Sequence, residues 1–285
     1  MNKIINIFIF LIILVFASCS TKPKVTQDIY NLRAFAERGL DSANKEIAQG
    51  NYASANSLLS EYKRMAVLSD DSSLIARVCL SYGNALYYIG KTNEAFAEWE
   101  EAAYEALRAK NPELLSVSRI FKAKGNLMSG RSAAQAVLDE VNRESTNIKK
   151  DRFFVAYSWQ VKGLALRALS RFKEAEDAMK QSLAIHEKKK SLENSSFDWY
   201  TIASIRSLAN NTAGAIEALE RSIQIDRRIE NSWGIAASYR AMGDVYRKMD
   251  KENEALNAYA RAKNIYTALK NNDEVEEIEK RIRNK

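Results

Sequence analysis

The sequence repeats with a period of 40 residues, and this period constrains the fold more than any other feature. Residues that commonly end helices recur at this spacing, namely Gly50, Gly90, Gly130, Ser170, Asn210 and Asp250. Glycine and asparagine tolerate the left-handed backbone conformation found at helix ends. Each unit of 40 residues is therefore expected to form two helices that meet at a turn, and six such hairpins follow one another.

Small and large side chains follow the same period. Five residues after the turns lie Ala55, Ala95, Gln135, Ala175, Ala215 and Ala255, and seven residues before them lie Ala43, Gly83, Ala123, Gly163, Ala203 and Gly243. Nine residues after the turns lie Leu59, Trp99, Asp139, Met179, Leu219 and Tyr259. Small residues on two successive helices allow close crossing, while the large residues fill the remaining space. With only two prolines in 285 residues, the chain is expected to be all-helical.

The best-preserved units resemble the tetratricopeptide repeat. Trp159-x-x-x-Gly163 followed by Phe172-x-Glu174-Ala175-x-x-x-Met179 carries this resemblance, as does the equivalent segment from Tyr239 to Tyr259. The resemblance implies a right-handed superhelical solenoid of about six hairpins over residues 31–271, with the first helix of each hairpin lining a concave face. The common repeat has 34 residues, so longer second helices or longer connections are expected here.

Two segments depart from the regular unit. The third repeat has Arg119, Gln135 and Asp139 at positions that are normally apolar or small, and Leu138 beside Asp139 indicates a one-residue slip of its second helix. The polar stretch at 142–150 is interpreted as the longer loop of a drifted repeat, with a hinge as the alternative. Residues 272–285 carry apolar side chains at helical spacing and predict a capping helix.

The N-terminus has the features of an export signal. Residues 1–18 combine a charged start, an apolar run and small residues, which describes a secretory signal peptide. Phe16-Ala17-Ser18-Cys19 resembles the bacterial lipobox, which implies that Cys19 carries acyl chains and that residues 19–30 form a tether. An ordinary signal peptide is the alternative. The expected location is the cell envelope, and Ser20 favours the outer membrane where two membranes exist.

Residues suited to catalysis or cofactor binding are sparse. The single histidine, His186, is assigned to a solvated helix face, and Cys79 is assigned to the core. The chain has neither a glycine-rich phosphate loop nor a nucleophile motif, so no catalytic residue, metal site or cofactor is predicted. The net charge is +7 with both signs interspersed, and a basic arm is missing, so nucleic acid is not an expected partner.

A protein or peptide in the cell envelope is the expected partner, bound on the concave face. Tyrosine and arginine, which dominate binding hot spots, recur on the stripe expected to line that face. The predicted partner-binding residues are Asn84, Tyr87, Tyr88, Tyr157, Gln160, Arg167, Tyr200, Arg240, Asp244, Arg247 and Lys248. A two-carboxylate clamp, known in some members of the family, is not matched because Leu40 precedes Asn44 where lysine is required.

The leading functional interpretation is a lipid-anchored scaffold or adaptor of the cell envelope. The alternatives are a carrier or receptor that holds a small apolar ligand inside the superhelix, and a surface adhesin. A deep pocket lined by tyrosine and tryptophan would favour the carrier, whereas an open groove would favour the adaptor.

Overall fold

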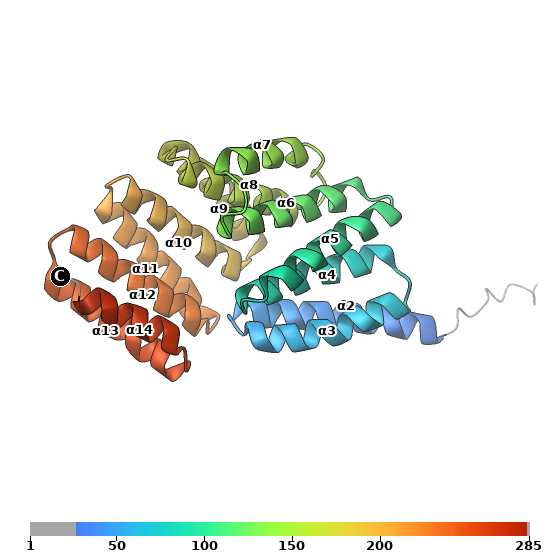
Figure 1. Ribbon diagram of the computed structural model, residues 1–285, viewed down its shortest axis with the longest axis horizontal. Coiled ribbons are helices and arrows are strands. Elements are labelled where there is room, and N and C mark those ends of the chain that lie inside the picture. The colour runs from blue at the N-terminus through green and yellow to red at the C-terminus, as the bar shows by residue number, and fades with distance from the viewer. Residues whose placement is uncertain (1–26, 284–285) are drawn as a thin grey trace, which may run out of the picture.

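The computed structural model describes residues 27–283, and this part of the chain is helical without any strand (Figure 1). Its helices are α2 (Gln27–Ala48), α3 (Tyr52–Leu68), α4 (Ser72–Tyr88), α5 (Thr92–Arg108), α6 (Pro112–Met128), α7 (Ala134–Ser145), α8 (Arg152–Ala168), α9 (Phe172–Lys189), α10 (Leu192–Leu208), α11 (Thr212–Arg228), α12 (Ser232–Lys248), α13 (Glu252–Ala268) and α14 (Asn272–Arg283). The predicted signal peptide and Cys19 lie outside the described residues.

Successive helices pack in pairs, and each pair packs on the next. The contacts are most extensive within hairpins such as α4 with α5, α10 with α11 and α12 with α13, and they continue between neighbours such as α11 and α12. Six hairpins therefore form an all-α solenoid, and α14 packs on the last of them. Figure 1 shows the pairs arranged along an arc.

All six predicted turn residues adopt the left-handed conformation, with φ between 57° at Asp250 and 83° at Gly90. The turns between hairpins use the same conformation at Asp70, Lys110, Lys190, Glu230 and Lys270. The residue types at these turns between hairpins did not reveal them, because lysine and glutamate are also common within helices. Most helices of both kinds have 17 residues, so the extra length of the unit is shared by both helices and is not confined to the second helix or the connections. The 40-residue unit consists of two nearly equal halves.

Small residues sit opposite large ones where the helices of a hairpin cross. A Cβ added to Gly163 would lie 2.6 Å from Met179 Sδ, and one added to Gly243 would lie 2.5 Å from Tyr259 Cε1. Gly83 is covered by Trp99 in the same way. These distances are shorter than van der Waals contact, so the periodic pattern of small and large residues is confirmed as the packing of the core.

The third hairpin is irregular but firmly connected to the fourth. Helix α7 is only 12 residues long, and Leu138 is buried while Asp139 is exposed, which confirms the predicted slip. In the connection that follows, Glu113 Oε1 accepts hydrogen bonds from the backbone N–H groups of three successive residues at 2.9–3.0 Å. Ile148 is also buried. These contacts favour a drifted repeat over a hinge.

The arc brings the first hairpin against the fifth and sixth. A Cβ on Gly50, in the turn between α2 and α3, would lie 3.1 Å from both Asn231 Oδ1 and Trp233 Cβ, at the start of α12. Figure 1 shows this end of the blue helices beside the orange ones. The 40-residue period contains no information about this contact, because it joins hairpins distant in sequence.

Candidate functional site

The main candidate site is an open groove formed by the first helices of the last hairpins and by α14. Its volume is about 870 Å³. Helices α10, α12 and α14 contribute most of its walls, and α11 and α13 contribute the rest. The lining residues are Tyr200, Ala203, Ser204, Ser207, Leu208, Leu219, Ala241, Asp244, Val245, Arg247, Lys248, Tyr259, Glu277, Lys280 and Arg281.

Four of the predicted partner-binding residues meet in this groove, namely Tyr200, Asp244, Arg247 and Lys248. Helix α14 adds Glu277, Lys280 and Arg281, which were not predicted because residues 272–285 were treated only as a cap. These three residues stand 40 positions after Ala237, Arg240 and Ala241. Extending the repeat by one more helix would have found them.

The charges of the groove are only partly compensated within it. Arg281 pairs with Asp244 at 2.7 Å and with Glu277 at 3.2 Å, and the Tyr259 hydroxyl donates to the same Asp244 carboxylate. Lys248 Nζ instead donates to the Ser207 carbonyl and hydroxyl oxygens at 3.2 and 3.1 Å. Within residues 27–283 its ammonium forms no ion pair, so it presents a positive charge to the groove.

Two predicted arginines hold neighbouring helices and do not line the groove. Arg240 Nη1 pairs with Glu274 Oε2 at 2.6 Å and so attaches α14 to α12. Arg167 Nη1 donates to Ser204 Oγ at 3.0 Å, and burial lowers the pKa of its guanidinium. A charge reversal at Arg240 would bring two carboxylates together and would disturb α14.

Tyr157 and Gln160 were predicted to face a partner, but the structure buries both in the fourth hairpin. Tyr157 stacks on Phe121 at 4.1 Å between ring centroids, and burial raises the pKa of its hydroxyl. Gln160 Nε2 donates to Asp198 Oδ1 at 2.8 Å. Helices α6 and α10 both pack against α8. These contacts explain why Tyr157 and Gln160 are not exposed to a partner.

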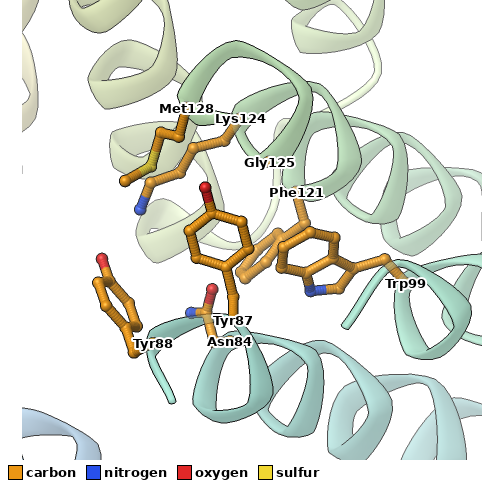
Figure 2. Close-up of a pocket in the computed structure, with 8 residues that line it drawn as sticks. All are labelled: Asn84, Tyr87, Tyr88, Trp99, Phe121, Lys124, Gly125 and Met128. Carbon is orange, nitrogen blue, oxygen red and sulfur yellow. The ribbon is translucent and has the colours of Figure 1, made fainter. Parts of the chain in front are cut away.

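The remaining predicted residues, Asn84, Tyr87 and Tyr88, lie together in a second, smaller pocket between α4 and α6 (Figure 2). Its volume is about 10 Å³, which is room for about one water molecule. This pocket shares no lining residue with the groove of α10, α12 and α14.

His186 was assigned to a solvated face, and this assignment is wrong. The ring is buried, and its Nδ1 lies 2.8 Å from Asp198 Oδ2, while Ser182 Oγ donates to the same oxygen at 2.9 Å. Burial raises the pKa of Asp198, although its hydrogen bonds oppose the rise. Asp198 comes from the next hairpin, which explains why the local sequence around His186 did not predict the burial.

Ser182, His186 and Asp198 are the residue types of a nucleophilic triad, but their arrangement differs from one. In a triad the serine and the carboxylate contact opposite nitrogens of the imidazole. Here Ser182 and Asp198 both approach Nδ1, and Nε2 is buried without a hydrogen-bond partner. The cluster therefore has no path for proton relay from serine to carboxylate through the ring.

Cys79, Glu98 and Glu101 form the one group in residues 27–283 with the spacing of metal ligands, with ligand atoms within 4.8 Å of one another. Lys63 Nζ lies 2.8 Å from Glu98 and 2.7 Å from Glu101. Its ammonium takes the place that a cation would occupy. Burial raises the pKa of the Cys79 thiol, which agrees with the predicted core position.

Comparison with known proteins agrees with the geometry of the hairpins. Residues 196–268 match the tetratricopeptide repeat family model, and this segment covers most of α10 to α13. The fold is a tetratricopeptide-like solenoid. The three solved structures described next are only 13–14% identical to the chain. No curated protein is significantly similar to it.

Three tetratricopeptide-like neighbours illustrate the similarity of fold. PlcR of Bacillus thuringiensis, in complex with the peptide PapR7 and DNA, has a TM-score of 0.61 at 14% identity over 90% of this chain and 99% of that one. A Rap protein complexed with Competence and Sporulation Factor has 0.60 at 13% identity, over 85% and 72%. BtubC of P. vanneervenii has 0.57 at 14% identity, over 85% and 92%.

Proposed function

We propose that this protein is an adaptor that binds an extended segment of a protein partner in the groove of α10, α12 and α14. The groove itself carries this proposal, because it is open, has a volume of about 870 Å³ and is lined by residues of the first-helix stripe. Two neighbours of similar fold were solved with bound partners, PlcR with a peptide and Rap with Competence and Sporulation Factor. These complexes support the proposal that the partner is a protein or peptide.

The chemistry of the groove suits an amphipathic segment with an acidic residue. Tyr200 and Leu208 offer apolar area, and Lys248 offers an ammonium without an ion-pair partner in the described chain. Tyrosine combines a large apolar face with a hydroxyl, which makes it effective in binding hot spots. Complementary charge would orient the segment and speed its association.

The carrier of a small apolar ligand is a weaker proposal. The groove is lined by charged residues from α12 and α14, and no tryptophan is among them. Burying these charges against an apolar ligand would leave them without water or hydrogen-bond partners, at a considerable cost. The described structure contains no feature that favours an adhesin.

The proposed setting is the cell envelope, with the chain anchored through acylated Cys19. The charged start, apolar run and small residues of positions 1–18 support it, together with the lipobox-like Phe16-Ala17-Ser18-Cys19. Within residues 27–283, none of the helices has the length and apolar character needed to cross a membrane. Ser20 favours the outer of two membranes.

The double variant Tyr200→Ala/Lys248→Glu tests the groove. We expect it to weaken binding of partners captured from solubilised envelopes by about thirtyfold or more, because loss of a hot spot typically costs about 2 kcal/mol or more. Affinity is measured by titration of the purified partner, and circular dichroism verifies the helices. High salt is expected to weaken the lysine contribution and spare the tyrosine contribution.

A matched control carries the same two changes outside the groove, Tyr104→Ala/Lys173→Glu. Both positions are exposed on second helices, α5 and α9. This control is expected to bind as the wild type does. Equal affinity of the folded groove variant and the wild type would place the binding face elsewhere.

Cys19→Ala tests the anchor separately from the groove. We expect this variant to incorporate no labelled fatty acid and to lose its membrane attachment or its processing, because a thiol is required for the thioether bond to lipid. Ser18→Ala is the control, since it keeps a small residue before the cysteine. Fatty acid labelling of the Cys19→Ala variant would refute the anchor while leaving the groove proposal intact.

A further inference from the structure

Large apolar side chains that remain exposed are concentrated in the first two hairpins. Within residues 27–283, five of the nine such residues belong to α2, α3 and α5. Val67 and Leu68 end α3, and Tyr104 and Leu107 lie near the end of α5, all four with 50–61% of the residue exposed. Single apolar residues are normal on a protein surface, whereas a group of them indicates a contact with something else.

These four residues lie on neighbouring helices. Val67 and Leu107 are 40 residues apart, so they occupy equivalent positions on α3 and α5. Lys63 on α3 pairs with two glutamates of α5 at 2.7–2.8 Å, and Arg108 Nη2 lies 3.5 Å from Asp70 Oδ1 in the turn after α3. The apolar edge is defined as Val67, Leu68, Tyr104 and Leu107.

The apolar edge lies on the side of the molecule where the described chain begins. Helices α2 and α3 form an antiparallel hairpin, so the start of α2 at Gln27 lies beside the end of α3. Arg33 Nη1, in the second turn of α2, lies 3.1 Å from Asp71 Oδ2, which follows the turn after α3. Figure 1 shows the start of α2 and the ends of α3 and α5 on the same side.

This side is also the one nearest to the proposed lipid anchor. Cys19 precedes Gln27 by eight residues. Because an extended chain spans at most about 3.6 Å per residue, these residues reach no further than about 29 Å. An acylated Cys19 would therefore hold the start of α2, and with it the apolar edge, beside the membrane surface.

A lipid surface suits the apolar edge better than a second copy of the chain does. A stable interface between proteins typically buries about 800 Å² on each partner and involves about 20–30 residues of each, far more than four side chains. On a membrane the anchor makes the contact intramolecular, so a small apolar area is sufficient. Tyrosine is also enriched at the boundary between lipid and water, where its ring and hydroxyl are both accommodated.

We propose that the apolar edge contacts the lipid surface to which the chain is anchored and so fixes the orientation of the solenoid. This inference rests on the proposed anchor at Cys19. The acyl chains supply the attachment, and the apolar edge decides which side of the molecule faces lipid. Figure 1 shows α13 and α14 on the opposite side from the start of α2. This orientation would therefore leave the groove of α10, α12 and α14 open to a partner.

The test holds the mature chain on vesicles without acyl chains. A hexahistidine segment replaces Cys19 and binds nickel-chelating lipid in vesicles of phosphatidylethanolamine and phosphatidylglycerol. Because Cys79 is buried, a fluorophore attaches selectively to a single introduced cysteine, Leu68→Cys or Leu107→Cys. We expect nitroxide-labelled lipid to quench either label several-fold more than a label at Leu208→Cys. Leu208 is a matched site, since it is also exposed at the end of a helix, α10.

Tyr104→Ser/Leu107→Ser removes much of the apolar surface while the label stays at Leu68→Cys. We expect quenching to fall to the level measured at Leu208→Cys. The matched control is Met128→Ser/Leu208→Ser, which replaces two exposed apolar side chains at the ends of α6 and α10 and is expected to leave quenching at Leu68→Cys unchanged. Circular dichroism verifies that both variants keep their helices.

Three results would overturn the lipid contact. Equal quenching at positions 68, 107 and 208 is one, and it needs only single changes at exposed sites. Another is undiminished quenching in folded Tyr104→Ser/Leu107→Ser. The third is a change in label fluorescence that grows with protein concentration in the absence of vesicles, which would assign the apolar edge to a second copy of the chain.

The anchor and the apolar edge can fail separately. Fatty acid labelling of Cys19→Ala tests the anchor, whereas the vesicle experiment uses a chelate in place of acyl chains. The groove is separate as well, because its partner affinity is measured in solution without membranes. Tyr104→Ala/Lys173→Glu therefore remains a valid control for the groove.

Discussion

Replacing Asp198 by alanine is expected to lower the free energy of unfolding by about 3–5 kcal/mol, because removal of one partner leaves a buried polar cluster unmatched. Asp198 accepts hydrogen bonds from Gln160, Ser182 and His186 at 2.8–2.9 Å, and it links three helices. Alanine leaves all three side chains without this acceptor. Urea denaturation of the variant and the wild type measures the loss.

Asp177→Ala is the control for Asp198→Ala. Asp177 is exposed on α9, and we expect its replacement to change stability by less than about 0.5 kcal/mol. A loss below about 1 kcal/mol in Asp198→Ala would contradict the prediction. It would mean that water molecules or neighbouring side chains replace the hydrogen bonds that Gln160, Ser182 and His186 lose.

Asp226→Asn is expected to stabilise the protein at neutral pH and to have little effect near pH 4. Burial raises the pKa of Asp226 to about 6 from an ordinary value of 3.8, although Ser196, Asn231 and Ser222 oppose the rise through hydrogen bonds. Between these two values the folded state binds more protons than the unfolded chain. Stability therefore falls as pH rises, and the loss is complete above about pH 6.

The difference between the two pKa values corresponds to about 3 kcal/mol at neutral pH. Asparagine keeps the shape of the side chain and carries no charge, so it removes this loss. Denaturation at pH 4, 5, 6 and 7 measures the free-energy difference between variant and wild type, which should grow with pH. Asp177→Asn is the exposed control, and a difference independent of pH would contradict the assignment to Asp226.

Two buried carboxylates lie at or beside a position that recurs with the 40-residue period. Asp198 determines the environment of His186, and Asp226 occupies the position equivalent to His186 one repeat later. Tyr266 follows another 40 residues on, and all three positions are buried. Alignment of the repeats would have suggested that positions 186, 226 and 266 share one buried environment. The side chains that contact each of these positions depend on how successive hairpins pack.

The candidate groove was partly predictable. The stripe of first-helix positions correctly placed Tyr200, Asp244 and Lys248 on one surface, because residues at helical spacing share a face. The same rule failed for Tyr157 and Gln160, which neighbouring helices cover. The spacing of residues along a helix specifies the side of the helix on which they lie. Whether that side is exposed to solvent depends on how the neighbouring hairpins pack against it.

The sequence by itself determined the helices, their turns and the crossing points within each hairpin. Those features follow from local conformation and from the sizes of side chains a few residues apart, as in Gly243 against Tyr259. Only the tertiary structure decided that Gly50 meets Trp233 and that His186 is buried. These outcomes depend on small rotations between hairpins that accumulate along the solenoid, and no single repeat encodes their sum.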